Sequence, residues 1–299
     1  MNKKIKSALS NPYYGCELVL NQIARFVSDE HFVKWKYFLN FHKKLNLENP
    51  QTYNEKLQWL KLYDRREEYT QMVDKYEAKK YVANLIGEEY IIPTLGVYNS
   101  FDEIDFDKLP NQFVLKCTHN SGGIIICRDK ATLDISKARK QMTKWLKKNP
   151  YWSNREFPYK NVTPRVIVET LMEQGNGEPL RDYKFLCFHG KVKLIELHRN
   201  RNLDNYTQDF YDENWNRTSI AQVGDPISKD FFPKPENFDL MKRFSELLTR
   251  KMKHCRVDWY EIDHRLFFGE ITFYDASGLI PFENEKDNLM IGSWIDINN

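Results

Sequence analysis

The sequence has few cysteines, and none are paired at the spacing of a metal site. Its five cysteines are Cys16, Cys117, Cys127, Cys187 and Cys255, and no two of them form a C-x-x-C pair. An odd number without such a pair argues against a disulfide framework or a structural zinc site. We therefore expect reduced, buried thiols in a cytoplasmic protein.

Long apolar runs and a large excess of one charge are also missing. The basic stretch at the start of the sequence is followed by no apolar segment of signal-peptide length, and no later segment has the length of a membrane span. The 45 basic and 42 acidic residues give a formal net charge of only +3. This balance argues against nucleic-acid wrapping and against a polyanionic tail. We expect no nucleic-acid partner, no membrane span and a cytoplasmic location.

No Walker A motif and no G-x-G-x-x-G that opens a helix occurs in the chain, so a P-loop or Rossmann nucleotide site is disfavoured. What is present is 299 residues of mixed texture, enough for a multi-lobed unit or two domains with a buried core. Thr52 and Glu55 have capping-box spacing before a run of helical periodicity. Short β-branched and aromatic runs then alternate with polar helices. These patterns predict an α+β fold with a helical arm over 1–85, a small lobe over 86–170 and a C-terminal lobe over 171–299.

A polar loop with two glycines joins two apolar runs in "LKCTHNSGGIII". Lys116 lies on the first run, and Ser121, Gly122 and Gly123 lie in the loop. Glycines let backbone N–H groups close on phosphate oxygens, and a lysine adds a positive charge. The segment is thus a candidate phosphate site, and a plain hairpin turn with an exposed lysine is the alternative.

The apolar run "RVIVETLME" ends in Glu169, with Met172 three residues later. A strand that leads into a crossover between lobes has free backbone N–H and C=O groups, which suit the edge of an adenine ring. A core strand with a solvated end is the alternative.

The segment "RVDWYEIDHRLFFGEITFY" reads as two strands joined by a turn at Asp263 and His264. Such a turn places Asp258 directly opposite Glu270 on the neighbouring strand. Opposed carboxylates repel each other unless a divalent cation or an arginine compensates them, and Mg²⁺ favours two carboxylates plus phosphate oxygens. Arg256, in the same strand, leaves an arginine-compensated sheet as the alternative to a metal site.

Two further runs contribute charged side chains. "RDYKFLCFHGK" places Asp182 and Lys184 on one strand face, and "ELHRNR" adds Arg199 and Arg201. A charged sheet face opposite the core is the alternative for all four residues. The order of the motifs supports a functional interpretation of all of them together. ATP and Mg²⁺ held between two lobes require lysines, a glycine loop, a strand-end glutamate and a late arginine with two carboxylates.

This order of motifs resembles the ATP-grasp superfamily of carboxylate–amine ligases. It resembles more closely the TupA-like ATP-grasp proteins of surface-polysaccharide and teichuronopeptide biosynthesis, which are often labelled glycosyltransferases. The matching stretches include "NPQTYNEKLQWLK", "DKYEAKKYV", "FVLKCTHNSGG", "IVETLME", "DYKFLCFHGKV", "RVDWYEID" and "FGEITFY", between about Leu45 and Trp294. The resemblance implies the ATP-grasp fold, in which two α+β lobes hold ATP between them, with ATP and Mg²⁺ as cofactors.

The resemblance also implies a role for each matching residue. Those implied to bind the nucleotide are Lys75, Lys116, His119, Asn120, Ser121, Gly122, Gly123, Glu169, Met172, Asp182 and Lys184, with 119–123 as a mobile loop and Glu169 and Met172 at the adenine. Asp258 and Glu270 are implied metal ligands, joined by Thr272 where many ATP-grasp ligases carry asparagine. Lys116, Lys184 and Arg256 are the implied catalytic residues.

The implied reaction is the formation of an acyl phosphate from ATP and a carboxylate, followed by attack of an amine to give an amide. Lys184, Arg199 and Arg201 are candidates for holding an anionic acceptor such as a uronic acid, so the expected partners are an anionic sugar or polysaccharide precursor and an amine or amino acid. A transferase, either a glycosyltransferase or a sugar kinase, is the alternative. A nucleotide-binding protein without turnover is a third.

Overall fold

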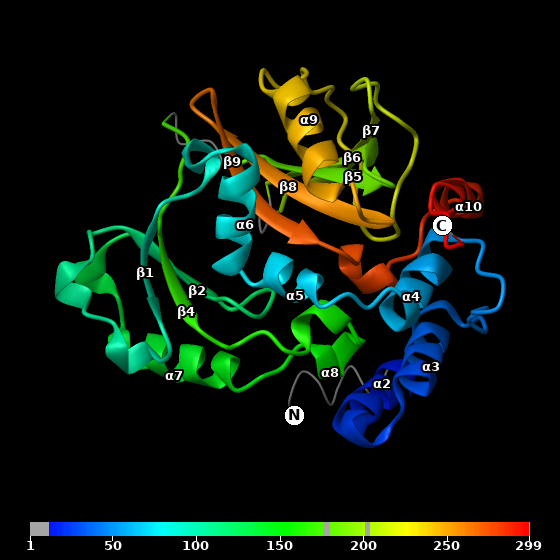
Figure 1. Ribbon diagram of the computed structural model, residues 1–299, viewed down its shortest axis with the longest axis horizontal. Helices are drawn as coiled ribbons and strands as arrows, with labels where there is room; N and C mark the ends of the chain where they lie inside the picture. The colour runs from blue at the N-terminus through cyan, green and yellow to red at the C-terminus, as the bar shows by residue number, and fades with distance from the viewer. Residues whose placement is uncertain (1–11, 176–179, 201–203, 299) are drawn as a thin grey trace.

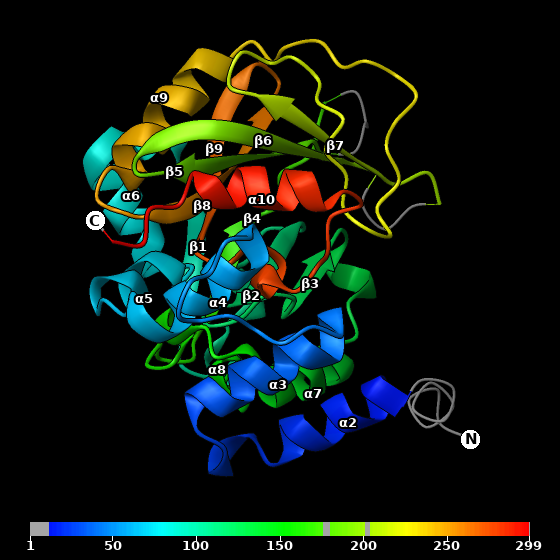
Figure 2. The ribbon, with the colours of Figure 1, turned by 90° about the vertical axis from the view of Figure 1, so that its right-hand side faces the viewer.

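The computed structural model describes residues 12–175, 180–200 and 204–298, so Arg201 of the predicted acceptor site lies outside the described residues. The chain forms two antiparallel sheets, one in each lobe, with helices packed outside them (Figures 1 and 2). The α+β arrangement predicted from the sequence is confirmed.

The first part of the chain is helical, as the periodicity predicted. Its α-helices are α2 (Pro12–Gln22), α3 (Asp29–Phe41), α4 (Tyr53–Tyr63), α5 (Glu68–Val73) and α6 (Glu77–Ile86). The predicted capping box begins α4: the Glu55 N–H donates to Thr52 Oγ1 over 3.2 Å, and the Thr52 N–H donates to Glu55 Oε2 over 3.0 Å. Both groups satisfy backbone N–H donors that the first helical turn leaves without partners.

The smaller sheet has the strand order β1-β4-β2-β3. Its strands are β1 (Thr94–Tyr98), β2 (Phe113–Cys117), β3 (Ile124–Cys127) and β4 (Val166–Thr170). Helix α7 (Ile135–Leu146) covers this sheet through Ala138 and Met142, and α8 (Tyr151–Asn154) lies beyond it in the chain. Short 3-10 helices in the chain are η1 (Ala24–Phe26), η2 (Glu88–Tyr90), η3 (Phe101–Glu103), η4 (Phe106–Lys108), η5 (Lys130–Thr132), η6 (Phe157–Tyr159) and η7 (Asp275–Gly278).

The larger sheet has the strand order β7-β6-β5-β8-β9. Its strands are β5 (Asp182–Phe188), β6 (Lys191–Arg199), β7 (Thr207–Asp212), β8 (His254–Ile262) and β9 (Arg265–Thr272). Helix α9 (Phe238–Thr249) packs its apolar side on one face, where Trp259 Nε1 donates to Ser245 Oγ over 2.8 Å. Since strand neighbours alternate in direction, Lys184 and Asp258 point to the other face. Helix α10 (Glu285–Ser293) lies against α4 (Figure 1).

The hairpin of β8 and β9 has the predicted turn but not the predicted pairing. Asp263 and His264 have φ values of 47° and 65°, and Ile262 pairs with Arg265 as a two-residue turn requires. Farther along, the pairs Val257–Ile271 and Trp259–Phe268 leave two residues of β9, 269 and 270, opposite the single residue 258 of β8. The prediction of a direct pair between Asp258 and Glu270 is therefore wrong, because a β-bulge interrupts the ladder there.

The cysteines agree with the expectation in part. None forms a disulfide, and four are buried, but Cys16 is exposed. No helix among the described residues is both long and apolar enough to cross a bilayer.

Candidate active site

A cavity of about 400 Å³ lies between the two sheets. The residues that line it come from both lobes and from the segment before α6: Lys75, Lys79, Ile92, Lys116, Ser121, Gly122, Ile124, Glu169, Asp182, Lys184, Asp258, Tyr260, Phe268, Gly269 and Glu270. The structure thus brings together most of the residues that the sequence analysis assigned to nucleotide and metal. These side chains divide into a basic end and an acidic end, and an apolar part lies beside them.

The basic end is built around Glu169, which is buried on β4. Its Oε2 lies 2.6 Å from Lys116 Nζ on the adjacent strand β2, and its Oε1 contacts Lys79 Nζ from α6. Burial alone would raise the pKa of Glu169, but the two lysines hold it below its usual value. Lys75 is fixed beside them, because its N–H donates to Thr118 O over 3.0 Å. Two lysines share one buried carboxylate here and Lys75 lines the same cavity, so this end carries a surplus of positive charge.

Lys79 is the cation that the sequence analysis missed at this end. Its Nζ also donates to Ile92 O over 2.8 Å, which directs the side chain inward. Burial is the leading cause of the lowered pKa of Lys79. Its place four residues after Lys75 in "DKYEAKK" was the available signal, because that spacing returns to the same side of a helix.

The glycine loop after β2 presents only part of itself to the cavity. Ser121 and Gly122 line the cavity, and Gly122 has a φ of 90°, which disfavours a side chain there. Asn120 Oδ1 accepts from the Gly123 N–H over 3.1 Å, and the buried His119 ring hydrogen-bonds to Lys148 O over 2.9 Å. His119 and Asn120 therefore fix the shape of the loop, whereas Ser121 and Gly122 are the part that a phosphate could approach.

The acidic end is organised by Arg256, which is buried on β8. Its Nε and one terminal nitrogen donate to the two oxygens of Asp258 over 2.7 and 2.8 Å. The same terminal nitrogen lies 3.2 Å from Glu270 Oε1, and the other terminal nitrogen bonds to Asp275. The arginine-compensated pair, one of the two alternatives left by the sequence, is present.

A buried lysine adds to this end. Lys184 Nζ lies 2.5 Å from Asp258 Oδ2 and 2.8 Å from Asp182 Oδ2. Burial and Arg256 both oppose its charge, but Asp258 and Asp182 raise the pKa of Lys184 to about 12. Lys184 is therefore a permanent cation that joins two carboxylates of the site.

The carboxylates still outnumber the cations at this end. The acidic side chains gathered on and around this sheet face are Asp182, Glu196, Asp258, Glu270 and Asp275. Lys184 and Arg256 are the buried cations that contact four of them directly, and His198 bonds to Glu196. A surplus of negative charge inside a protein favours the binding of a cation.

Glu270 is the carboxylate best placed for such a cation. Its side chain is 40% exposed, and its Oε2 lies 3.7 Å from Lys75 Nζ, a looser contact than those of Asp258. Burial and Asp258 act to raise its pKa, but Lys75 and Arg256 hold the pKa of Glu270 below its usual value. Over the described ranges, no group of three or more His, Cys, Asp or Glu side chains is arranged to hold a metal ion. Glu270 and Asp258 would supply the few carboxylate oxygens that Mg²⁺ takes from a protein, with phosphate oxygens and water completing its shell.

Thr272 lies behind Glu270 in the same network. Its hydroxyl accepts from Arg256 and donates to Glu270 Oε1, each over 3.2 Å. The threonine hydroxyl thus orients Glu270. An asparagine at this position would contact Glu270 through a carboxamide instead.

The remaining predicted residues lie outside the cavity lining. Met172 packs beside Ile92 and Phe267 in an apolar cluster that adjoins the cavity, because Ile92 belongs to both. The Arg199 guanidinium stacks 3.5 Å from the centre of the Phe232 ring, and its NH1 lies 3.4 Å from Ser228 Oγ.

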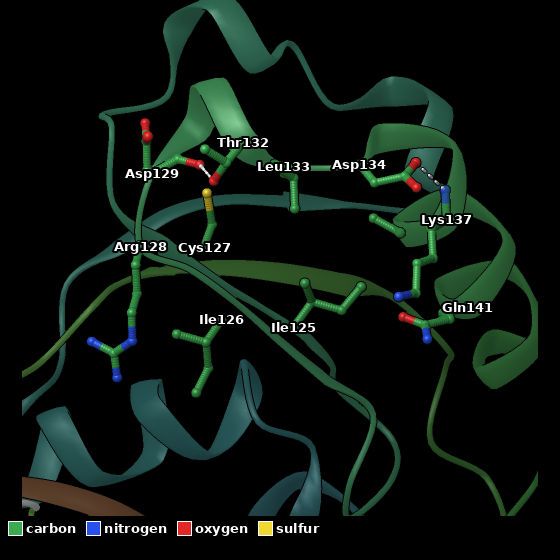
Figure 3. A pocket seen from close by; sticks show the side chains of 11 residues that line it. Ile125, Ile126, Cys127, Arg128, Asp129, Thr132, Leu133, Asp134, Lys137 and Gln141 are labelled. Atoms are coloured by element: carbon green, nitrogen blue, oxygen red, sulfur yellow. Dashed lines mark hydrogen bonds between the residues drawn. The ribbon is translucent and has the colours of Figure 1, made fainter.

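A second hollow lies on the outer side of the small lobe, between β3 and α7 (Figure 3). It is lined by Ile125, Cys127, Arg128, Asp134 and Lys137, among others. No predicted site residue lines it, and its charged side chains come from the segment between β3 and α7 and from α7 itself.

The chain is similar to known proteins in family and in fold. Residues 55–296 match the family described as TupA-like ATPgrasp. A search of curated proteins finds no match. Among solved structures, the chain is similar to D-alanine–D-alanine ligase from Bacillus anthracis complexed with ATP, at 16% identity and a TM-score of 0.42, over 68% of this chain and 55% of that one.

Two further structures are similar at the same level. They are the D-alanine–D-alanine ligase of Helicobacter pylori (15% identity, 81% of this chain and 68% of that one, TM-score 0.42) and the ADP complex of an N5-carboxyaminoimidazole ribonucleotide synthetase (12% identity, 82% and 57%, TM-score 0.44). The chain spans little more than half the length of the first of these solved structures. Because the family match covers most of the sequence, the chain belongs to the TupA-like ATP-grasp family and has the ATP-grasp fold expected from its motifs.

Proposed function

We propose that this protein is an ATP- and Mg²⁺-dependent ligase that joins a carboxylate to an amine through an acyl phosphate. The observation that carries the proposal is the division of one cavity into a basic end at Lys75, Lys79 and Lys116 and an acidic end at Asp258 and Glu270. A nucleoside triphosphate needs cations along its phosphates, and its accompanying metal needs carboxylates. Membership of an ATP-grasp family supports the same assignment.

In this proposal the nucleotide lies along the cavity. Ile92 and Phe268, with Met172 beside them, provide apolar contact for the adenine ring, and Lys116 and Lys75 contact phosphates. Glu169 fixes the two lysines Lys79 and Lys116, so that its main role is to position cations rather than to contact the base. Backbone N–H groups of Ser121 and Gly122 close over the phosphates.

The reaction has two steps. An oxygen of the substrate carboxylate attacks the γ-phosphorus, the bond to the β–γ bridging oxygen breaks, and ADP leaves. The amine nitrogen then attacks the acyl carbon, phosphate leaves with its electron pair, and the nitrogen loses a proton. The lysines of the basic end neutralise charge on the transferred phosphoryl group, and Mg²⁺ held at Glu270 and Asp258 would stabilise the phosphate oxygens.

For the acceptor, we propose a sugar acid such as a uronic acid of a surface polysaccharide precursor, and an amino acid or amine as the second substrate. Arg199 remains partly exposed at the end of β6 and is our candidate for binding an anionic acceptor. Lys184 already joins Asp182 and Asp258, so its proposed role is to hold those carboxylates in place. The helical arm and the two lobes would act as one unit around the cavity, in the cytoplasm.

The deciding experiment follows an isotope. Purified protein is incubated with ATP, Mg²⁺, an amino acid and uronic acids labelled with ¹⁸O in the carboxylate, and the released phosphate is analysed by mass spectrometry. A ligase transfers one ¹⁸O into phosphate. A sugar kinase leaves the phosphate on the sugar, and a glycosyltransferase releases a nucleotide from a sugar donor without consuming ATP. Amide formation with unlabelled phosphate would exclude the acyl phosphate.

A further inference from the structure

The outer face of the first helices carries an unusual amount of exposed apolar surface. Phe26, at the end of η1, is 91% exposed. The large apolar side chains exposed on α2, η1 and α3, which we call the α2–α3 surface, are Tyr13, Val19, Ile23, Phe26, Trp35 and Phe38. Exposed apolar surface gathered on one element in this way marks an interaction site more often than chance exposure does.

The α2–α3 surface is not the side by which the two helices pack together. Leu20 and Ala24 of α2 are buried against Phe32 of α3, and that contact forms the inner core of the pair. On the outside, Val19, Ile23, Trp35 and Phe38 line a groove of about 500 Å³. Helix α2 lies at the edge of the molecule, at the opposite end from α9 (Figure 2). The surface is therefore remote from the candidate active site and free for a partner.

The charge of this part of the chain indicates the kind of partner. Residues 1–44 contain eight of the 45 basic residues of the chain but only three of its 42 acidic residues. Each of those three is neutralised: Glu17 lies 2.6 Å from Lys36, Glu30 lies 2.5 Å from Lys34, and Asp29 is bound by Arg155 and Arg65. Two of these pairs also use cations of the segment, Lys34 and Lys36, so its positive net charge comes from the difference in number, eight basic residues against three acidic ones.

A positive apolar surface restricts the choice of partner. Two copies of this chain that met through the α2–α3 surface would bring two positive segments together, which is unfavourable. Exposed aromatic and aliphatic side chains with basic neighbours are instead typical of helices that lie in the interface of an anionic bilayer. No described helix crosses a membrane, so such binding would be peripheral. We propose that the α2–α3 surface binds the protein to an anionic lipid bilayer, with Ile23, Phe26 and Trp35 inserted at the level of the headgroups.

Vesicle flotation with the full chain tests the proposal. We expect the protein to float with phosphatidylcholine vesicles that contain phosphatidylglycerol, and to bind pure phosphatidylcholine at least about tenfold more weakly. The double substitution Ile23→Gln and Phe26→Gln should lower binding to the anionic vesicles at least about tenfold, because two apolar side chains lose their burial. The matched control is Phe231→Gln, which changes a 64% exposed phenylalanine in the loop before α9 and should bind as the parent does.

A second pair of variants tests the charge. Replacing Arg25 and Lys44, two exposed basic residues of the described segment, by glutamine should weaken binding roughly 25-fold, since each basic residue near the membrane contributes about a factor of five. The control replaces two exposed lysines of α7, Lys140 and Lys144, and should have little effect.

Three outcomes would overturn the proposal. The first is no flotation with anionic vesicles. The second is an equal loss of binding in the matched controls, because it would mean that binding depends on total charge alone. The third is a dimer in sedimentation equilibrium that dissociates in the Ile23→Gln, Phe26→Gln variant, or an acidic protein partner captured in the same way without lipid binding. ATP turnover, measured in parallel, is expected to stay unchanged in every variant, so failure of this proposal is separate from failure of the proposed ligase.

Discussion

Lys116 Nζ and Glu169 Oε2 lie 2.6 Å apart on adjacent strands of the small sheet. Glu169 also contacts Lys79, so one buried carboxylate fixes two lysines that face the cavity. A lysine held this way loses little further freedom when a phosphate binds. Preorganised cations of this kind stabilise charge in a transition state more than flexible ones do.

The first prediction concerns Lys116. The substitution Lys116→Ala should lower the rate of ¹⁸O transfer from carboxylate to phosphate by roughly 10²–10³-fold, the usual cost of removing one preorganised electrostatic partner. The melting temperature should change little, because Lys79 remains to pair with Glu169. Lys140→Ala, on exposed α7, is the control and should keep full activity. A Lys116→Ala enzyme with parental activity would remove this lysine from the proposed mechanism.

The second prediction concerns the metal. Glu270→Gln should abolish Mg²⁺-dependent ATP turnover. The fold should stay intact, because the Glu270 side chain is 40% exposed and does not by itself shield its partners from water. Titration of Mg²⁺ in the presence of an ATP analogue should show the loss directly, as a weaker apparent affinity. Glu213→Gln, at a turn distant from the cavity lining, serves as the control. Retention of most activity by Glu270→Gln would place the metal elsewhere.

The third prediction concerns the choice of nucleotide. ATP with Mg²⁺ should raise the melting temperature, since a ligand that binds the folded state stabilises it by mass action, with about 2.7 kcal/mol expected at a hundred times the dissociation constant. UDP-sugars should produce no comparable shift. A larger shift with a UDP-sugar would favour a glycosyltransferase over the ligase.

The fourth prediction concerns Lys184, which is 2% exposed. Lys184→Met should destabilise the protein by about 3–5 kcal/mol, because Asp182 and Asp258 would then lie buried with one cation fewer. Urea unfolding at pH 7 measures the loss. A loss below about 1 kcal/mol would show that the site tolerates its surplus negative charge without this lysine.

The fifth prediction is a pH dependence of stability at His254, the first residue of β8. Its Nδ1 hydrogen-bonds to Cys187 O over 3.0 Å, and its Nε2 hydrogen-bonds to the hydroxyl of Tyr53 at the start of α4 over 3.0 Å. Burial lowers the pKa of His254 to about 3, whereas an unfolded histidine has a pKa of about 6.5. Between these values the unfolded state binds more protons, so the free energy of unfolding falls as pH falls from about 6.5 to about 3.

Urea unfolding across this pH range tests the point. His254→Asn should be less stable at pH 7 but lose less stability on acidification than the parent does. His264→Gln is the control, because Glu236 raises the pKa of exposed His264. That histidine contributes stability below its usual pKa, which is lost as pH rises, so removing it should not reduce the acid sensitivity. Equal acid sensitivity of parent and His254→Asn would contradict the prediction.

Local patterns in the sequence predicted local structure well. Thr52 and Glu55 form the capping box, and Asp263 and His264 form the hairpin turn, because in both cases the interacting groups are a few residues apart. Contacts between residues far apart in the sequence could not be predicted in the same way. Asp275 lies three residues beyond Thr272, the partner of Arg256 in the sheet, and its carboxylate bonds to Arg256. No local sequence pattern predicts this contact.

The candidate site shows the same limit. The cavity brings together predicted residues from five separate motifs. The resemblance to a family located these motifs, whereas local propensity alone did not. What escaped prediction was pairing across elements: that Glu169 of β4 holds two lysines, and that Lys184 is buried between Asp182 and Asp258. Each of these pairs depends on strand order, which only the folded chain determines.

The β-bulge on β9 determines which residues of this hairpin lie opposite each other. Pairing is regular from the turn to Trp259 and again from Val257 onward, and the extra residue between these two stretches lies opposite Asp258. If Gly269 were deleted, the ladder would close without interruption, and Asp258 and Glu270 would face each other with Cβ atoms about 4.5–5.5 Å apart. The distance between the two carboxylates is thus encoded by the number of residues in the strand, so a one-residue change in length there would alter the site even if every charged side chain were kept.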